Sequence, residues 1–319
     1  MAINRVQMQP GLSLAEFIQH YGTESQCEQA LAGARWPRGF VCPACRCRLH
    51  TTFERGGRGH WQCQRCHHQT TITAGTIFDS TKLPLTTWFL GMHLLTQAKN
   101  NVSALELMRQ LGVSWRTAWR VKHKLMQVMA QRESKRQLSG RVEIDDAYLG
   151  GERAGKPGQC GRGSPNKIPF VMAVSTVDDR KPHQIVIRCM PFTSEAVADW
   201  ANDALAAETD AVSDGLSAFR ALRAEVASHL AIVTGSGRSS AEHPEFQWVN
   251  IVLGNLKTAI SGTYHAFKFA KYAPRYLAEF QYRFNRRYDL RSILPRLLRA
   301  AATTTPWPEH RLTRAELCT

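Results

Sequence analysis

Hydrophobic and polar residues alternate with a helical period in the middle of the chain. Apolar residues recur every three or four positions after residue 84, at Leu85, Trp88, Phe89, Met92 and Leu95. This spacing puts them on one side of an α-helix. The pattern therefore predicts an amphipathic helix whose apolar side packs in a core.

Two further helices are predicted directly after this one. Leu105, Met108 and Leu111 form the next apolar row, which we expect to face inward. The row ends at Gly112, and Ser114 is suited to cap the start of another helix because its hydroxyl can accept a main-chain hydrogen bond. A helix, a short glycine turn and a helix are typical of a helix-turn-helix module.

The last of these helices carries an apolar and a basic row. The apolar row, which we expect to face the core, consists of Ala118, Val121 and Leu125. The basic row, spaced by four, consists of Arg116, Arg120 and Lys124. A solvated basic face is the simpler interpretation, and DNA binding is the alternative. In the second case Arg116 would reach base edges and Lys124 a phosphate.

The period changes from helical to strand-like after a charged stretch at 131–140, which we interpret as a linker. Strands are predicted at 141–149, 168–177, 183–190, 209–213 and 229–234, with a helix at 194–207. Three hairpin-like strands followed by alternating helix and strand predict an α/β domain. Another helix is predicted at 246–260, with Asn250 and Lys257 on one side.

Four cysteines form two CxxC pairs with seventeen residues between the pairs. They are Cys42, Cys45, Cys63 and Cys66. This spacing is typical of a zinc ribbon, in which four thiolates hold one structural Zn²⁺ and leave no position for water or substrate. Free buried cysteines are the alternative. We interpret Cys47, His60, His67 and His68 as bystanders to this site.

Composition narrows the class of protein. The chain has 319 residues, 43% of them hydrophobic, which favours a folded multidomain protein over a disordered one. The 41 Lys and Arg against 26 Asp and Glu give a formal net charge of +15. This surplus favours nucleic acid as a partner, with an anionic membrane surface as the weaker rival. We find no secretory signal or membrane-spanning segment, so we expect a cytoplasmic protein with no membrane partner.

Two aspartates lie in or next to predicted apolar strands, where a carboxylate is unfavourable. Asp145 lies within the apolar strand at 141–149, and Asp214 follows the strand at 209–213. A carboxylate in such a place is costly unless it is paired or binds a metal. If the two strands adjoin, the pair offers the hard oxygen ligands that Mg²⁺ requires. An exposed turn or edge-strand acid is the alternative for either residue alone.

A glycine-rich basic segment at 150–167 follows the first strand. We expect it to form a loop in which Arg162 and Lys167, among other basic residues, hold a phosphate backbone.

At this point the chain resembles bacterial insertion-sequence transposases of the ISXO-like group. The resemblance rests on the order and spacing of several segments: SLAEFIQHYGTESQC, RWPRGFVCPACRC, TAGTIFDSTKLPLTTWF, VEIDDAYLGG, GRGSPNKIPFVMAVS, GNLKTAISGTYHAF and YLAEFQYRFNRR. It implies a zinc-ribbon head joined to a ribonuclease-H-like, retroviral-integrase-like domain with a mixed five-stranded sheet. The implied organisation is a zinc-ribbon segment at 1–80, a helix-turn-helix module at 81–135, a catalytic domain at 136–300 and a tail at 301–319.

The resemblance also implies a catalytic set of the DDE type, with Asn as third member and a following Lys. By position these are Asp145, Asp214, Asn250 and Lys257. The first three would hold two Mg²⁺ or Mn²⁺ ions. Because Asn250 brings no negative charge, we expect the second ion to be held less tightly than by a Glu. Asp146, Glu143, Glu242 and Glu245 are reserve ligands.

The implied function is that of a DNA transposase. It would bind the terminal inverted repeats of its element, cut at the ends and join them to target DNA as a homo-oligomer, associated with the bacterial nucleoid. The alternatives are a DNA-binding regulator that has lost the chemistry and a nuclease that hydrolyses without joining.

Overall fold

The computed structural model describes residues 6–150, 167–177, 181–233, 243–264 and 269–314. The chain divides into two compact units, each described here by itself. Unit 1 consists of Met1–Val128 and Arg286–Leu312, and unit 2 of Met129–Asn285 with Thr313–Thr319. The boundary falls inside one helix, α5, so its main chain passes from one unit to the other without leaving the helix.

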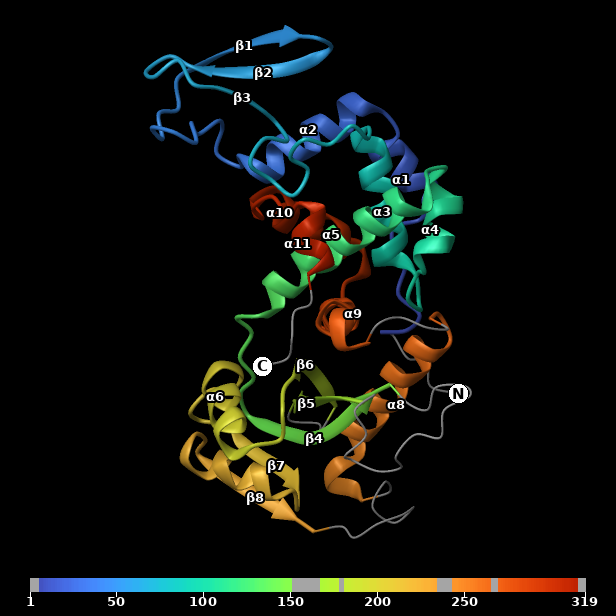
Figure 1. Ribbon diagram of the computed structural model, residues 1–319, viewed down its shortest axis with the longest axis vertical. Helices are drawn as coiled ribbons and strands as arrows, with labels where there is room; N and C mark the ends of the chain where they lie inside the picture. Colours follow the sequence, from blue (N-terminus) through green and yellow to red (C-terminus); the bar gives the residue numbers. More distant parts are fainter. Residues whose placement is uncertain (1–5, 151–166, 178–180, 234–242, 265–268, 315–319) are drawn as a thin grey trace. The chain divides into compact units, whose positions relative to one another are not determined.

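Unit 1 is helical apart from the segment with the two CxxC pairs, here called the ribbon. Its helices are α1 (Leu14–Tyr21), α2 (Glu24–Arg35), α3 (Leu85–Gln97), α4 (Ala104–Leu111), the greater part of α5 (Trp115–Glu133), α10 (Ile293–Thr303) and α11 (Glu309–Thr313). Helix α10 packs against α2 and α3 (Figure 1). Within the described ranges, no helix is both long enough and apolar enough to cross a membrane.

Helices α4 and α5 are joined as the sequence predicts. Gly112 ends α4 in the left-handed region at φ 63°, and its N–H donates to the Met108 carbonyl. Ser114 caps α5, since its hydroxyl accepts from the Thr117 N–H at 3.3 Å. The apolar row of Ala118, Val121 and Leu125 is buried as predicted. On α4, however, Leu107 is the buried residue and Leu105 is 47% exposed, so the predicted inward row is wrong at its first member.

The ribbon is a three-stranded antiparallel sheet. Strand β1 (His50–Arg55) pairs with β2 (Arg58–Cys63), which pairs with β3 (Gln69–Thr71). The β1–β2 hairpin turns at Gly56 and Gly57, whose φ values of 60° and 70° suit glycine. Phe40 packs with the cysteines and with Trp36 and Trp61 in a small core.

Unit 2 is built on a five-stranded mixed sheet in the order β6-β5-β4-β7-β8 (Figure 1). The strands are β4 (Arg141–Leu149), β5 (Ile168–Thr176), β6 (Pro182–Cys189), β7 (Asp210–Asp214) and β8 (Ser228–Ile232). The β4–β5 and β5–β6 pairs are antiparallel, whereas β4–β7 and β7–β8 are parallel. The mixed five-stranded sheet is therefore confirmed. The ribonuclease-H-like assignment stays a prediction.

Helices cover both faces of this sheet. Helix α6 (Ser194–Ala204) and the 3₁₀ segment η1 (Ser217–Ala224) pack on one face, where Val142 and Ile144 of β4 point. Helices α8 (Gln247–Ser261) and α9 (Phe269–Phe284) pack on the other, where Ala147 and Leu149 point. Alternate residues of β4 thus enter different cores, and the face toward α8 also receives Glu143 and Asp145.

The compact units divide the chain differently from the predicted domains, whose boundaries stay a prediction. Helix α10 belongs to unit 1 although most of it falls within the predicted catalytic range of 136–300, because its row of Leu294, Leu297, Leu298 and Ala301 is buried there. The predicted tail contains α11, with Leu312 buried. The predicted linker at 131–140 is shorter than expected, since α5 continues to Glu133.

The outer edge of β6 is paired with side chains instead of a strand. Asn285 accepts from the Ile185 N–H at 2.7 Å and donates to the Ile185 carbonyl at 2.9 Å, and Gln281 of α9 accepts from the Ile187 N–H at 2.9 Å. Asn285 also donates to the buried carboxylate of Glu133, the last residue of α5. These bonds satisfy edge groups that otherwise invite another strand.

Candidate functional site

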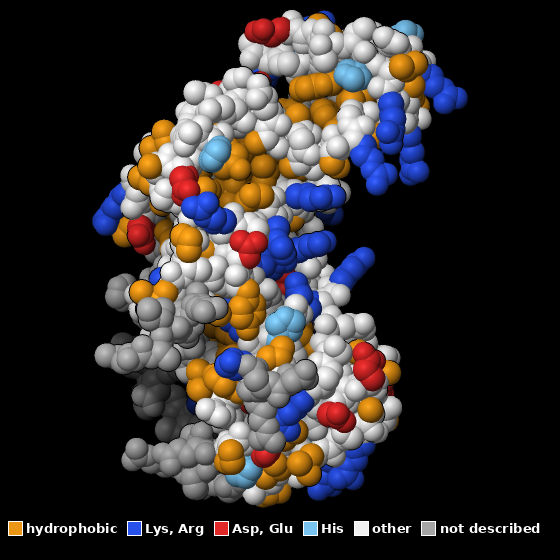
Figure 2. Space-filling view, turned by 180° about the vertical axis from the view of Figure 1, so that it is seen from behind, with side chains coloured by type: hydrophobic (Ala, Val, Ile, Leu, Met, Phe, Trp, Pro, Cys, Tyr) orange, Lys and Arg blue, Asp and Glu red, His pale blue; other side chains and the backbone are white. Residues whose placement is uncertain are grey.

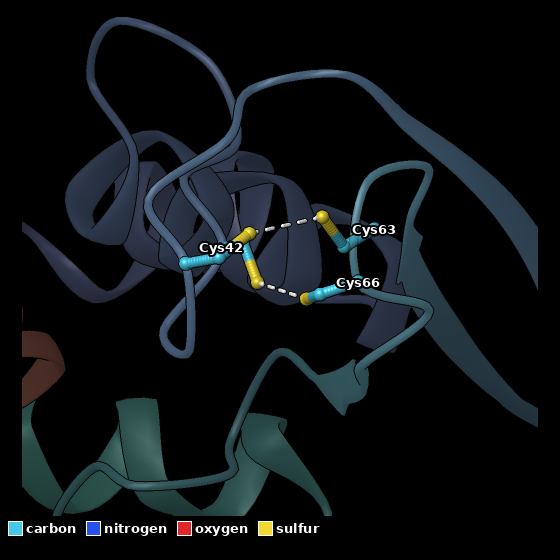
Figure 3. Close-up of side chains that lie close together, drawn as sticks. Cys42, Cys63 and Cys66 are labelled. Carbon is cyan, nitrogen blue, oxygen red and sulfur yellow. Dashed lines mark hydrogen bonds between the residues drawn. The ribbon is translucent and has the colours of Figure 1, made fainter.

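The four predicted zinc ligands converge on one point. Their sulfur atoms lie within 4.8 Å of one another, with Cys42 and Cys66 3.6 Å apart and Cys45 and Cys63 3.5 Å apart (Figure 3). Cys42 and Cys45 precede β1, while Cys63 ends β2 and Cys66 lies in the turn before β3. Residues distant in the sequence are thus joined by the hairpin between them.

Both CxxC pairs have the same local geometry. The Arg46 N–H donates to the Cys42 carbonyl at 2.9 Å, and the His67 N–H donates to the Cys63 carbonyl at 3.0 Å. Arg46 and His67 both have a left-handed backbone, at φ 60° and 59°. Because the two turns have the same conformation, both thiols of each pair point to a common centre.

The chemistry of these donors fits zinc. A hydrogen bond from the Cys66 N–H, helped by Arg65 and opposed by burial, lowers the pKa of the Cys63 thiol to about 6. A thiolate is the form that binds metal, and the lowered pKa favours this form at Cys63. At Cys45, against a hydrogen bond from the Cys47 N–H, the neighbouring thiols of Cys66 and Cys63 raise the pKa to about 12. Cys47 packs beside the site but is not a member of the cluster. A closed set of four cysteines suits a structural ion.

The two predicted catalytic aspartates lie side by side in unit 2. Ile144 of β4 pairs with Ser213 of β7 in a parallel register, so the next residues, Asp145 and Asp214, meet at the same edge of the sheet. Their carboxylate oxygens and one of Asp146 lie within 4.8 Å of one another. The structure therefore brings Asp146, a reserve ligand in the sequence, into the cluster.

Main-chain hydrogen bonds orient these carboxylates. The Asp146 N–H donates to Asp145 Oδ1 at 2.9 Å, and the Leu216 N–H donates to Asp214 Oδ1 at 3.1 Å. Burial, together with the charges of Asp214 and Asp146, raises the pKa of Asp145 to about 7, against the opposing effects of the Asp146 N–H and the Lys257 charge. Close carboxylates with a raised pKa are typical of a site prepared for a cation.

Helix α8 supplies the other predicted residues. Asn250 and Lys257 line a cavity of about 650 Å³ that Asp145 and Asp146 also line. Lys167, predicted to contact phosphate, is a lining residue too. Arg162 lies outside the described residues. Candidate oxygen ligands and two basic side chains thus line the same cavity.

A buried acid fixes α8 relative to β4. Glu143 is 2% exposed, and its Oε2 accepts from the main-chain N–H groups of Trp248 and Val249, both at 2.9 Å. This carboxylate satisfies N–H groups that the first turn of a helix leaves unpaired. Nearby, Arg141 pairs with Glu245. Two of the reserve ligands, Glu143 and Glu245, therefore have structural partners.

Sequence reasoning did not identify this capping role. The available signal was the alternation in β4, which puts Glu143 and Asp145 on the same face two residues apart. Nothing in the sequence paired that face with the start of α8. Tyr148, Leu253 and Gly254 also line the cavity without having been predicted.

Metal binding at this centre is expected to depend on pH. Because a proton competes with the metal at Asp145, we expect the apparent affinity for Mn²⁺ to fall about tenfold between pH 8 and pH 6. The same raised pKa affects folding. Because the pKa of Asp145 in the folded protein exceeds the usual 3.8, the metal-free fold loses stability as the pH rises from about 4 to about 7. Calorimetric titration at each pH measures the affinity. An affinity that is constant across this range contradicts the assignment.

The three residues of the predicted basic row on α5 do not share the same contacts. Arg116 and Arg120 pair with Glu309 of α11 at 2.8 and 3.4 Å. Lys124 instead donates to the Ile77 carbonyl at 2.8 Å, and burial lowers its pKa. The predicted phosphate contact by Lys124 is therefore not favoured by its position, because the ammonium group is engaged with the main chain.

Known proteins are similar to the two parts of this chain that carry the candidate sites. Residues 22–69 match the family of transposase zinc-ribbon domains, and residues 137–285 match that of ISXO2-like transposase domains. An uncharacterized protein in transposable element ISH50 of Halobacterium salinarum is 27% identical over 138 residues, or 41% of this chain and 44% of that protein. The chain thus spans less than half of this relative. The resemblance of the sequence to insertion-sequence transposases is confirmed: the chain carries a transposase zinc ribbon followed by an ISXO2-like transposase domain.

Proposed function

We propose that this protein is a DNA transposase that cuts the ends of its element and joins them to target DNA. The observation that carries the proposal is the meeting of Asp145 and Asp214 on adjacent parallel strands, beside a cavity that Asn250 and Lys257 line. Three oxygen-bearing side chains and a cation next to an open cavity suit a phosphodiester substrate. Membership of the transposase domain family supports the same reaction.

Each residue has a distinct part in this scheme. Asp145 and Asp214 provide anionic oxygen ligands, and Asn250 provides a neutral one. Two Mg²⁺ or Mn²⁺ ions, when bound there, would activate the attacking oxygen and stabilise the leaving oxygen. Lys257 offsets the negative charge of the phosphate. Cleavage and joining both form one P–O bond and break another, with water attacking in the first and a DNA 3′-hydroxyl in the second, so one site can serve both.

Binding to DNA is assigned to unit 1. The ribbon exposes Arg38, Arg46, Arg48, Arg55, Arg58 and Arg65, with Glu54 as an exposed acid among them. Figure 2 shows several Lys and Arg side chains close together on the ribbon. Neutralising phosphates with such side chains makes binding strongly salt-dependent. We assign recognition of the inverted repeats to this surface and to Arg116 and Arg120 of α5.

The test uses the full chain and duplexes from the DNA that flanks its coding region. With Mg²⁺ or Mn²⁺ we expect cleavage at the element's end and products in which that end is joined to a second duplex. Cleavage without joined products favours a nuclease. Binding without cleavage under any divalent metal favours a regulator, and either result refutes the transposase proposal. Crosslinking in the presence of both ends tests the expected homo-oligomer.

The pairing of Glu309 with α5 leads to a separate prediction. Glu309→Gln releases Arg116 and Arg120, so we expect DNA to bind about two- to threefold more tightly, in keeping with the small free energy of exposed ion pairs. Fluorescence anisotropy with an end-bearing duplex measures this change. Glu106→Gln on α4 is the control, because it removes the same charge from an exposed position in the same unit. Equal effects of the two changes would exclude a specific role for the pairing.

A further inference from the structure

Helix α8 has a glycine where its own fold gives no reason for one. Gly254 lies in the interior of α8 with an ordinary helical backbone. A Cβ built there meets no atom of the described residues within 4 Å. Glycine weakens a helix relative to alanine, because it loses more backbone freedom on folding. Neither backbone conformation nor packing in the described structure therefore explains this residue.

The position of Gly254 in the site suggests the explanation. Asn250, Gly254 and Lys257 lie at positions i, i+4 and i+7, so they share one side of α8, and all three line the same cavity. Gly254 is about 6 Å along the helix axis from Asn250 and about 4.5 Å from Lys257. The glycine leaves bare main chain between a proposed metal ligand and a cation, in a cavity that Asp145 and Asp146 of β4 also line.

We propose that Gly254 is the contact surface on α8 for the sugar–phosphate backbone of the DNA strand being cut. The inference rests on the proposed function and adds a specificity-determining position to it. Without a side chain at 254, a strand can lie against α8 while its phosphate contacts Lys257 and faces Asp145. A methyl group there narrows the cavity from the helix side and holds the strand away. The ligand is identified by its chemistry, because a bare helix surface next to a cation suits a thin anionic backbone and offers no groups to recognise a base.

Gly254→Ala separates a DNA contact from a structural role of this glycine, because we expect the variant to be more stable but less active. We expect the midpoint of urea unfolding to rise, since alanine favours the helix. We expect DNA cleavage to fall at least tenfold, with Mn²⁺ affinity unchanged because no metal ligand is altered. Gly33→Ala is the matched control: Gly33 is an exposed glycine in helix α2, also with no described atom within 4 Å of an added Cβ. It should raise stability and leave cleavage unchanged.

A second measurement does not depend on cleavage. Lys257 is exposed in the protein, so an amine-reactive reagent should label it, and an end-bearing duplex with Ca²⁺ should protect it. We expect this protection to be lost in Gly254→Val. Equal protection in both proteins, or no protection in the unsubstituted chain, overturns the inference. If the unsubstituted chain never cleaves but Lys257 is protected only when residue 254 is glycine, the proposed function fails and the DNA contact stands.

Discussion

Asp145→Asn is expected to abolish cleavage and joining of DNA while binding to the element's ends is retained. The change keeps the shape of the side chain but removes an anionic ligand from the carboxylate cluster. The lost charge stabilisation is worth several kcal/mol, so we expect the rates of cleavage and joining to fall by about a thousandfold or more. Asp214→Asn should have an effect of the same order. Gel assays of cleavage and joining, alongside anisotropy for binding, measure both parts of the expectation.

Misfolding is not expected to explain that loss. Because the pKa of Asp145 is raised, its ionised form destabilises the metal-free fold, so Asp145→Asn should unfold at the same or a higher temperature at neutral pH. Asp203→Asn is the control, since it removes a charge from α6 in the same unit, where Asp203 pairs with Arg188. An Asp145→Asn protein that keeps more than a tenth of the activity contradicts the assignment of Asp145 as a metal ligand.

Cys63→Ser is expected to lose the zinc ion and the fold of the ribbon. The small core there consists largely of the cysteines and a few aromatic residues, so it has little apolar burial to hold β1 and β2 together without metal. Structural zinc sites contribute about 10–16 kcal/mol of binding free energy, and that stabilisation depends on all four ligands. We expect zinc content to fall from one ion per chain to none and DNA binding to be lost. Elemental analysis and anisotropy are the measurements.

Cys47→Ser provides the matched control for this change. Cys47 lies next to the site but outside the cluster, so the variant should keep its zinc. Metal binding by unit 2 should survive in both variants. Zinc retained at full occupancy in Cys63→Ser contradicts the ribbon assignment.

Sequence periodicity predicted the framework of unit 2 well. Strand β4 was predicted at its observed bounds, since Gly140 and Gly150 flank a run of strand length. The other four strands were predicted to within a few residues. The adjacency of Asp145 and Asp214 was a conditional expectation, since the order of strands in a sheet is set by tertiary packing and not by local pattern. The resemblance to a family identified Asn250 and Lys257; the residues alone did not.

The failures have a common physical cause. Leu105 and Leu107 point to nearly opposite sides of a short helix. Leu105 is three residues from Met108 and Leu107 is four from Leu111, so a three- or four-residue period does not decide which of the two is buried. The phosphate contact of Lys124 stays a prediction, but the basic row gave no sign that its long side chain donates to the Ile77 carbonyl. Helix α10 is far from α2 and α3 in sequence, and only the folded chain brings its leucines to them. Each error concerns a partner that lies outside the local pattern.

The Glu143 cap has a consequence for variation in length between related chains. It joins the strand that carries Asp145 to the first turn of the helix that carries Asn250, two residues or fewer from each. The spacing between Asp145 and Asn250 is therefore set at this junction, whatever the length of the loops among the more than ninety residues that run between β4 and α8. Lengthening a connecting loop costs little in closure entropy. Insertions in those connections should be tolerated, whereas a single deletion between Glu143 and Asp145 should abolish the proposed cleavage of DNA.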